Sequence, residues 1–202
     1  MFGRKKIQYV DPLTRASDPV GVSLNAEKLK YFRRLCWPWP FRWLIRWRSP
    51  DAAFAAYLQE GDSRAAIIMM TEPQLIVAAY TDELDAVALL QFPQELVRKY
   101  DLVKGQRLLT VNVYEYGAGE ESDLVLGPEH TGRYGNFIPL IAEFLSDDMD
   151  QIEARKSNIA QSEWQRTWRM GEEALFGGQG IRDGEPYMCS FPGEVKEELD
   201  SE

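Results

Sequence analysis

Histidine and cysteine are scarce in this chain of 202 residues, which has one of the first and two of the second. A single histidine, His130, excludes any site built from two or more histidines. Two cysteines far apart in sequence, Cys36 and Cys189, cannot supply a disulfide framework or a cysteine-rich zinc site. Thiols used this sparingly are typical of a reducing compartment, so we expect a cytoplasmic protein without a metal or other cofactor.

Long hydrophobic runs are also missing. The longest uncharged apolar runs, 65–70 and 75–80, have six residues each, whereas about 20 are needed to cross a bilayer. The basic start at residues 1–6 is followed by a polar stretch rather than an apolar one, which predicts no secretory signal. We therefore expect a chain that is cytoplasmic and at most peripheral to a membrane.

Positive charge is in the minority, with 23 Lys and Arg against 32 Asp and Glu and a net charge of -9. Such a balance opposes general binding to nucleic acid. The charge is divided unevenly, however, because residues 1–48 hold eleven basic and three acidic residues, a net of +8, and residues 49–202 have a net of -17. Any contact with an anionic partner must therefore be local to the first part of the chain.

The composition is that of one globular domain, with 45% hydrophobic and 12% aromatic residues. Between about residues 64 and 126, β-branched and aromatic residues gather in short runs bounded by turn formers, which predicts strands. A short helix with Pro93 near its start interrupts them, so the order is strand, strand, strand, helix, strand, strand. We predict an α+β fold with a five-stranded antiparallel small barrel or curled sheet, in an order shared with OB-type barrels. The predicted strands are 65–71, 75–80, 84–91, 107–116 and 123–126.

Helices are predicted on both sides of this sheet. Residues 1–22 are interpreted as a flexible arm, and residues 23–60 as basic aromatic helices that begin at Ser23 or Asn25. After a glycine-rich loop, Asn136 caps a helical segment predicted to extend to residue 176. Residues 177–202 are interpreted as a loop and an acidic tail, in which the last twelve residues hold five acids and one lysine.

The most unusual segment is residues 37–48, which contains four of the six tryptophans. On a helix its apolar side chains would share one broad arc opposite a narrow stripe of arginines. The aromatics could pack on the sheet as a lid, lie at a membrane headgroup boundary, or dock another protein, since Trp and Arg often carry interface energy. The candidate binding residues in this segment are Trp37, Trp39, Phe41, Arg42, Trp43, Arg46 and Trp47.

Evidence for catalysis is thin. His130 lies in a glycine-rich loop and could serve as a general base, although a lone loop histidine is more often solvated or hydrogen-bonded. Acidic groups near residues 120–123 and 147–150 lack the layout of a calcium loop, and the glycine-rich stretches match no phosphate-binding pattern. A hydrolase or transferase using His130 or these acids is thus the third hypothesis.

Tyr114 and Tyr116 alternate with Asn112 on one face of the fourth predicted strand. An exposed row of this kind would be a binding surface, and cross-strand packing of the tyrosines is the alternative. Our leading hypothesis is a non-catalytic interaction or adaptor module that docks a protein partner through residues 37–48 or through the acidic tail. The second is a membrane-peripheral protein that uses segment 37–48 on an anionic surface; nucleic acid is disfavoured as a partner.

Overall fold

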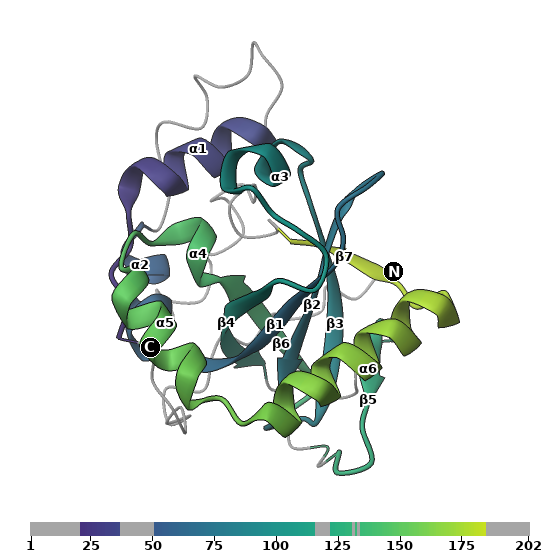
Figure 1. Cartoon of the computed structure of the whole chain (residues 1–202). Helices are drawn as coiled ribbons and strands as arrows, with labels where there is room; N and C mark the ends of the chain where they lie inside the picture. The colour runs from purple at the N-terminus through teal and green to yellow at the C-terminus, as the bar shows by residue number, and fades with distance from the viewer. Residues whose placement is uncertain (1–20, 37–50, 116–121, 131, 133, 185–202) are drawn as a thin grey trace, which may run out of the picture.

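The computed structural model describes residues 21–36, 51–115, 122–130, 132 and 134–184. Its centre is a curled, mostly antiparallel sheet with helices on both sides (Figure 1). The fold is therefore α+β with a half-barrel sheet, as the sequence predicts. Segment 37–48, Tyr116 and the acidic tail lie outside the described residues.

Two helices precede the sheet, α1 (Ala26–Cys36) and α2 (Asp51–Glu60). Asn25 caps α1, because its Oδ1 accepts hydrogen bonds from the backbone N–H groups of Glu27 at 2.8 Å and Lys28 at 3.1 Å. Leu29 and Phe32 are buried three residues apart on the inner face of α1. The cap and the spacing confirm the predicted helix start.

Three consecutive strands form an antiparallel meander, β1 (Asp62–Met70), β2 (Leu75–Thr81) and β3 (Ala86–Phe92). These strands are almost continuously apolar because both faces of the sheet are covered. The short helix α3 (Glu95–Tyr100) follows β3, and β4 (Arg107–Glu115) returns to pair with β1. This order confirms the sequence prediction.

The sheet has one more antiparallel strand than predicted. Its order is β5-β3-β2-β1-β4-β6, with β5 at Leu124–Leu126 and β6 at Asn136–Ile141. Asn136 therefore begins a strand, whereas the sequence predicts that it caps a helix. The apolar spacing of this run also suits a strand buried on both faces, and pairing with β4 decides between the two.

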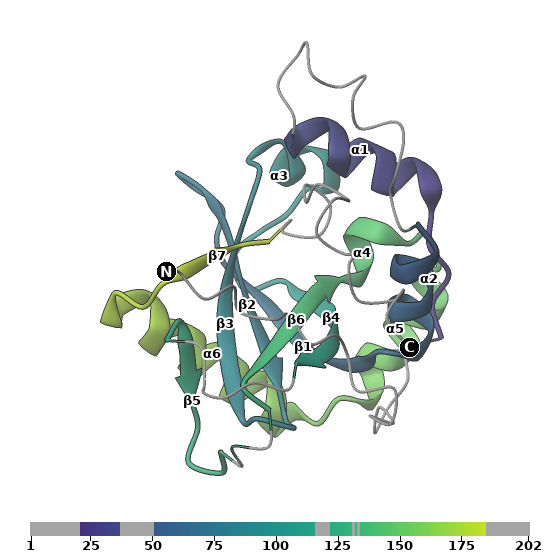
Figure 2. The same ribbon diagram turned by 180° about the vertical axis from the view of Figure 1, so that it is seen from behind.

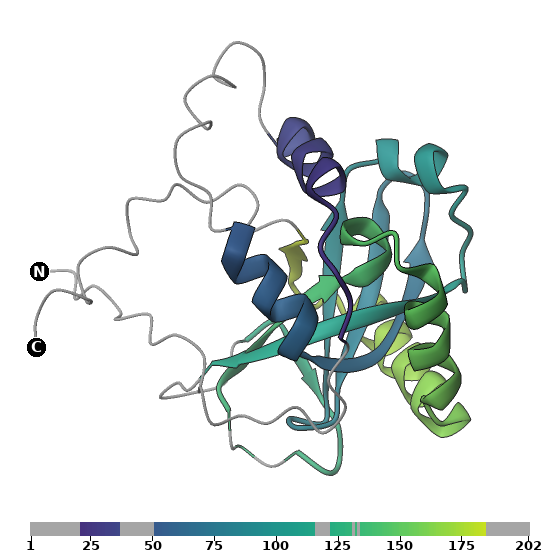
Figure 3. The same cartoon turned by 90° about the vertical axis from the view of Figure 1, so that its left-hand side faces the viewer.

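The rest of the predicted helical segment forms α4 (Ala142–Leu145), α5 (Met149–Asn158) and α6 (Gln161–Gly177). Helix α6 packs Trp164, Met170 and Ala174 on one face of the sheet. Helices α1, α2 and α4 contribute to the larger core on the other face. Figure 3 shows α2 and α6 on opposite sides of the sheet. Among the described residues, no helix combines the length and the apolar character that a membrane span requires.

A last short strand, β7 (Ile181–Asp183), pairs in parallel with β3 beside β5 (Figure 2). From β7, Arg182 contacts two other parts of the sheet region. Its Nε lies 2.6 Å from Asp123 Oδ2, and its Nη1 donates to the Phe137 carbonyl of β6 at 3.0 Å. Arg182 thus links the two ends of the curled sheet, which no backbone pairing joins within the described residues.

Candidate functional site

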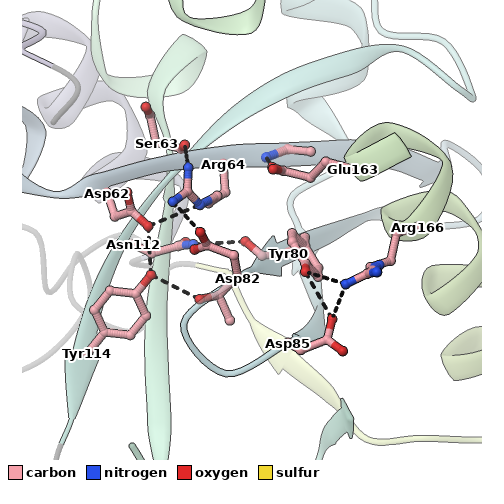
Figure 4. Close-up of polar contacts among 12 residues, drawn as sticks. Asp62, Ser63, Arg64, Tyr80, Asp82, Asp85, Asn112, Tyr114, Glu163 and Arg166 are labelled. Atoms are coloured by element: carbon pink, nitrogen blue, oxygen red, sulfur yellow. Dashed lines mark hydrogen bonds and ion pairs between the residues drawn. The ribbon is translucent and has the colours of Figure 1, made fainter. Parts of the chain in front are cut away.

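A group of polar and charged side chains, most of them buried, lies where β1 begins and where β2 and β4 end (Figure 4). We name Asp62, Arg64, Asp82 and Tyr114 the Arg64 cluster. Asp62 and Arg64 share a face of β1 because side chains alternate along a strand, and Asp62 pairs in register with Asn112 of β4. Strand pairing therefore brings together charges that are distant in sequence.

Arg64 is the centre of this cluster. Its Nε lies 3.2 Å from Asp62 Oδ2, its Nη1 donates to the Ser63 carbonyl at 3.1 Å, and its Nη2 bonds the Asp82 carboxylate. Burial lowers the pKa of Arg64, but the hydrogen bond to Asp82 and the charges of both aspartates outweigh it, so that pKa lies above its ordinary value. The guanidinium is therefore a permanent cation held by two carboxylates.

Tyr114 completes the Arg64 cluster from β4. It is only 2% exposed, and its hydroxyl donates to Asp62 Oδ2 at 2.9 Å and lies 3.0 Å from Thr81 Oγ1. Its ring stacks on Tyr134, with centroids 4.8 Å apart. Burial, with the charge of Asp62, raises the pKa of Tyr114. The phenol therefore stays protonated and stabilises the Asp62 carboxylate as a donor.

Asn112 is held by the same sheet end. Its Nδ2 donates to the Tyr80 carbonyl at 2.8 Å, and its Oδ1 accepts from Thr110 Oγ1 at 2.9 Å. Asn112 and Tyr114 are both buried, so these two side chains cannot belong to an exposed binding row; Tyr116, the third residue of that row, lies outside the described residues. Both side chains form hydrogen bonds in the interior of the protein instead.

A second polar group lies beside the first, around the turn between β2 and β3 (Figure 4). We name its members, Tyr80, Asp85, Glu129 and Arg166, the Asp85 cluster. Asp85 is 1% exposed and has a positive φ of 47°. Its Oδ1 accepts from the Tyr80 hydroxyl at 3.0 Å and lies 3.1 Å from Arg166 Nη1 of α6. Its Oδ2 accepts from the Glu129 backbone N–H at 2.8 Å. The cluster thus ties the turn to α6 and to the loop after β5.

Gly127 makes room for this arrangement. A Cβ atom at residue 127 would lie 2.1 Å from Asp85 Oδ2, well inside contact distance. The Gly127 backbone N–H donates to the Asp85 carbonyl at 2.6 Å. A glycine is therefore required for the loop to approach the turn this closely.

His130 faces the same turn. Its Nδ1 lies 2.7 Å from the Leu84 carbonyl, and because a carbonyl only accepts, Nδ1 carries the proton. One member of each predicted acidic group forms an ion pair. Asp147 pairs with Lys28 at 2.8 Å, and Asp123 pairs with Arg182 at 2.5 Å. No group of three or more His, Cys, Asp or Glu side chains in the described part of the chain could hold a metal ion.

In both clusters, one arginine forms ion pairs with two carboxylates of the same chain. Asp62, Asp82 and Asp85 each accept from donors of the same chain, and Arg64 and Arg166 are each bound by two carboxylates. A general acid or base must transfer a proton to or from a substrate. The carboxylates of these clusters instead accept hydrogen bonds from groups of the same chain. The arrangement stabilises one end of the sheet.

The sequence analysis missed the members of these clusters other than Tyr114. A usable signal is present, because Asp62 and Arg64 occupy alternate positions at the start of an otherwise apolar strand. Charges on a buried face imply partners. No such signal identifies Arg166, which lies on a helix far along the chain.

No known family model matches this chain, and neither does any curated protein or solved structure.

Proposed function

We propose that the protein is a non-catalytic interaction module that docks a protein partner through residues 37–48. The observation that carries this proposal is the density of Trp and Arg in that segment, which holds four tryptophans and three arginines within twelve residues. Trp and Arg are enriched among residues that dominate binding energy at protein interfaces. The segment connects α1 to α2.

The pairing of charges elsewhere supports a binding role over catalysis. Asp62 and Asp85 are almost fully buried and hydrogen-bonded, and His130 Nδ1 donates to a backbone carbonyl. Internal hydrogen bonds thus engage the best candidates for acid–base chemistry among the described residues.

The test is affinity capture from the native host with the full chain and with Trp43→Ala/Trp47→Ala, followed by titration of each captured protein after purification. We expect a purified partner to bind the full chain and to bind the double variant at least ~10-fold more weakly, since hot-spot truncations typically cost about 2 kcal/mol or more. Arg169→Gln, which changes an exposed cation on α6, is the matched control. Equal binding by all three proteins would contradict docking through this segment.

Attachment to an anionic membrane surface is the second candidate, because the exposed face of α1 adds Lys30 and Arg34 to the arginines of the segment. The same variants can be co-sedimented with vesicles of phosphatidylcholine alone and with added phosphatidylserine. Sedimentation only with phosphatidylserine, and its loss in the double variant, would favour the membrane. No sedimentation of the native chain would remove this candidate.

A further inference from the structure

Helices α1 and α3 lie side by side at the end of the molecule opposite to the Arg64 cluster (Figure 1). The two helices touch through Lys99 of α3, whose Nζ lies 3.2 Å from the centroid of the Tyr31 ring of α1. Both helices present cations to solvent. We name the exposed residues Lys30, Arg34, Arg98 and Lys99 the basic face.

The α3 half of this face consists of Arg98 and Lys99, which lie on the same helix as the exposed Glu95. Within the described residues, neither Arg98 nor Lys99 forms an ion pair with a carboxylate, and the Lys99 ammonium lies over the rings of Tyr31 and Tyr100. Asp147 acts on Lys99 only through its charge. Burial and the nearby charge of Lys28 lower the pKa of Lys99. Lys28 itself is balanced by Asp147 at 2.8 Å. On the α1 half, Lys30 lies 3.4 Å from Glu27, so the two cations without an ion pair among the described residues are those of α3.

The last described residues of the chain, up to Gly184, lie close to this face. Strand β7 runs toward the end that carries α1 and α3 (Figures 1 and 2). The Gly184 backbone N–H donates to the Gln91 carbonyl at 2.8 Å, and a Cβ at residue 184 would lie 2.5 Å from the Phe92 ring. That ring packs against Phe32 of α1 with centroids 6.5 Å apart, and α3 begins three residues after Phe92.

The residues that follow have the opposite charge. Residues 185–202 contain six acids and one lysine, a net of -5. Eighteen residues reach at most about 60 Å when extended, far more than the path from Gly184 to α1 and α3 requires. A tether of this length also holds the acids near the face at an effective concentration on the order of millimolar.

We infer that the acidic tail, residues 185–202, binds the basic face of α1 and α3 within the same molecule. The tail would compete there with any acidic partner or anionic surface that approaches from outside. The inference requires only the charges and the place where the tail begins, so it is independent of what residues 37–48 bind.

Paramagnetic broadening in the full-length chain tests this contact. A nitroxide is attached at Ser201→Cys in a Cys36→Ser/Cys189→Ser background, and amide signals are compared with those of the reduced, diamagnetic label. We expect broadening at residues 27–34 and 95–101 that is lost when Glu194, Glu197, Glu198, Asp200 and Glu202 are replaced by their amides. It should also be lost near 1 M salt, where the Debye length is about 3 Å.

Variants of the face provide the matched comparison. Arg98→Gln/Lys99→Gln should lose the broadening, and Arg169→Gln on α6 should keep it. Broadening that is unchanged by Arg98→Gln/Lys99→Gln, that persists at high salt, or that appears on another surface would overturn the inference. Dispersed spectra in every variant show that the fold is retained, and partner binding by residues 37–48 is scored separately by the capture assay.

Discussion

Charged side chains are paired at one end of strands β2 and β3, the Arg64 cluster, and exposed at the other end, the basic face. At the Arg64 cluster, one arginine is held between two aspartates and a tyrosine donates to one of them. At the α3 half of the basic face, Arg98 and Lys99 are exposed and form no ion pair with a carboxylate among the described residues. A buried charge needs an oppositely charged or hydrogen-bonding partner in the protein, whereas water solvates a charge at the surface. The charges at the first end therefore stabilise the fold, and those at the second end are accessible to an anionic partner.

Removing the arginine from the cluster should have the largest effect. Arg64→Met leaves Asp62, which is 1% exposed, without its cation. Breaking a buried pair in this way costs about 3–5 kcal/mol of the free energy of unfolding. Urea denaturation followed by circular dichroism measures the loss, with Arg98→Met as the control, which should stay within about 0.5 kcal/mol. Losses of equal size in the two variants would contradict the distinction between the two ends.

The tyrosine hydroxyl of the same cluster should matter less. Tyr114→Phe keeps the ring that stacks on Tyr134 but removes the donor to Asp62. A hydrogen bond to a charged group contributes about 1.5–3 kcal/mol, and thermal or urea unfolding should show a loss of that size. Tyr31→Phe at the basic face is the comparison. Its hydroxyl has no hydrogen bond within the described residues, so a comparable loss there would contradict the distinction.

Glycine substitutions should have opposite effects at the closely packed Asp85 and at the open end of α6. Gly127→Ala places a Cβ 2.1 Å from Asp85 Oδ2 and should destabilise the protein by about 1–3 kcal/mol, the usual range for overpacking. Gly177→Ala near the end of α6 meets no atom within 4 Å and should stabilise the helix by up to about 1 kcal/mol. Melting temperatures of the two variants should move in opposite directions. A shift in the same direction would show that the loop relaxes away from Asp85.

Glu143 tests whether burial, rather than position in the molecule, decides how a charge affects stability. Its side chain is buried although it lies near α1, at the end that carries the basic face. Burial raises the pKa of Glu143, and Lys156 at 3.3 Å and the Leu109 N–H only partly oppose this. A raised pKa means that the folded state holds the proton more tightly, so this carboxyl's contribution to stability falls as pH rises above its unfolded pKa of about 4.3.

The free energy of unfolding of Glu143→Gln should therefore increase relative to that of the native protein as pH rises from about 4 toward neutrality. Urea denaturation at a series of pH values measures the difference in unfolding free energy between the two. Glu153→Gln removes the exposed carboxylate that lies 2.8 Å from the same Lys156 and controls for loss of a partner of that lysine. A constant difference across the pH series would show that the Glu143 carboxyl titrates alike in both states.

The local sequence pattern was sufficient to predict much of the fold. The periods of α1, β1, β2 and β3 and the cap at Asn25 appear in the structure close to their predicted places. It failed at Asn136–Ile141, where an apolar run suits a helix as well as a buried strand. It also missed Ile181–Asp183, a strand of three residues that exists only through its parallel pairing with β3.

The candidate site was less predictable than the fold. Asp62 and Arg64 are neighbours in sequence, but Asp82, Tyr114 and Arg166 come from three other elements. Their meeting depends on sheet register and on where α6 crosses the sheet. Tyr114 shows the difficulty, because alternation along β4 predicts which residues share its face but not whether that face is covered.

The sequence by itself determined the composition of the core, most of the helices and strands, and the separation of a basic first part from an acidic remainder. These properties depend on neighbours along the chain, through the periods of helix and strand and the count of charges. Only the tertiary structure decided which charges are paired and which are left to solvent. Pairing depends on register, burial and the curl of the sheet, which bring together residues that no local pattern connects.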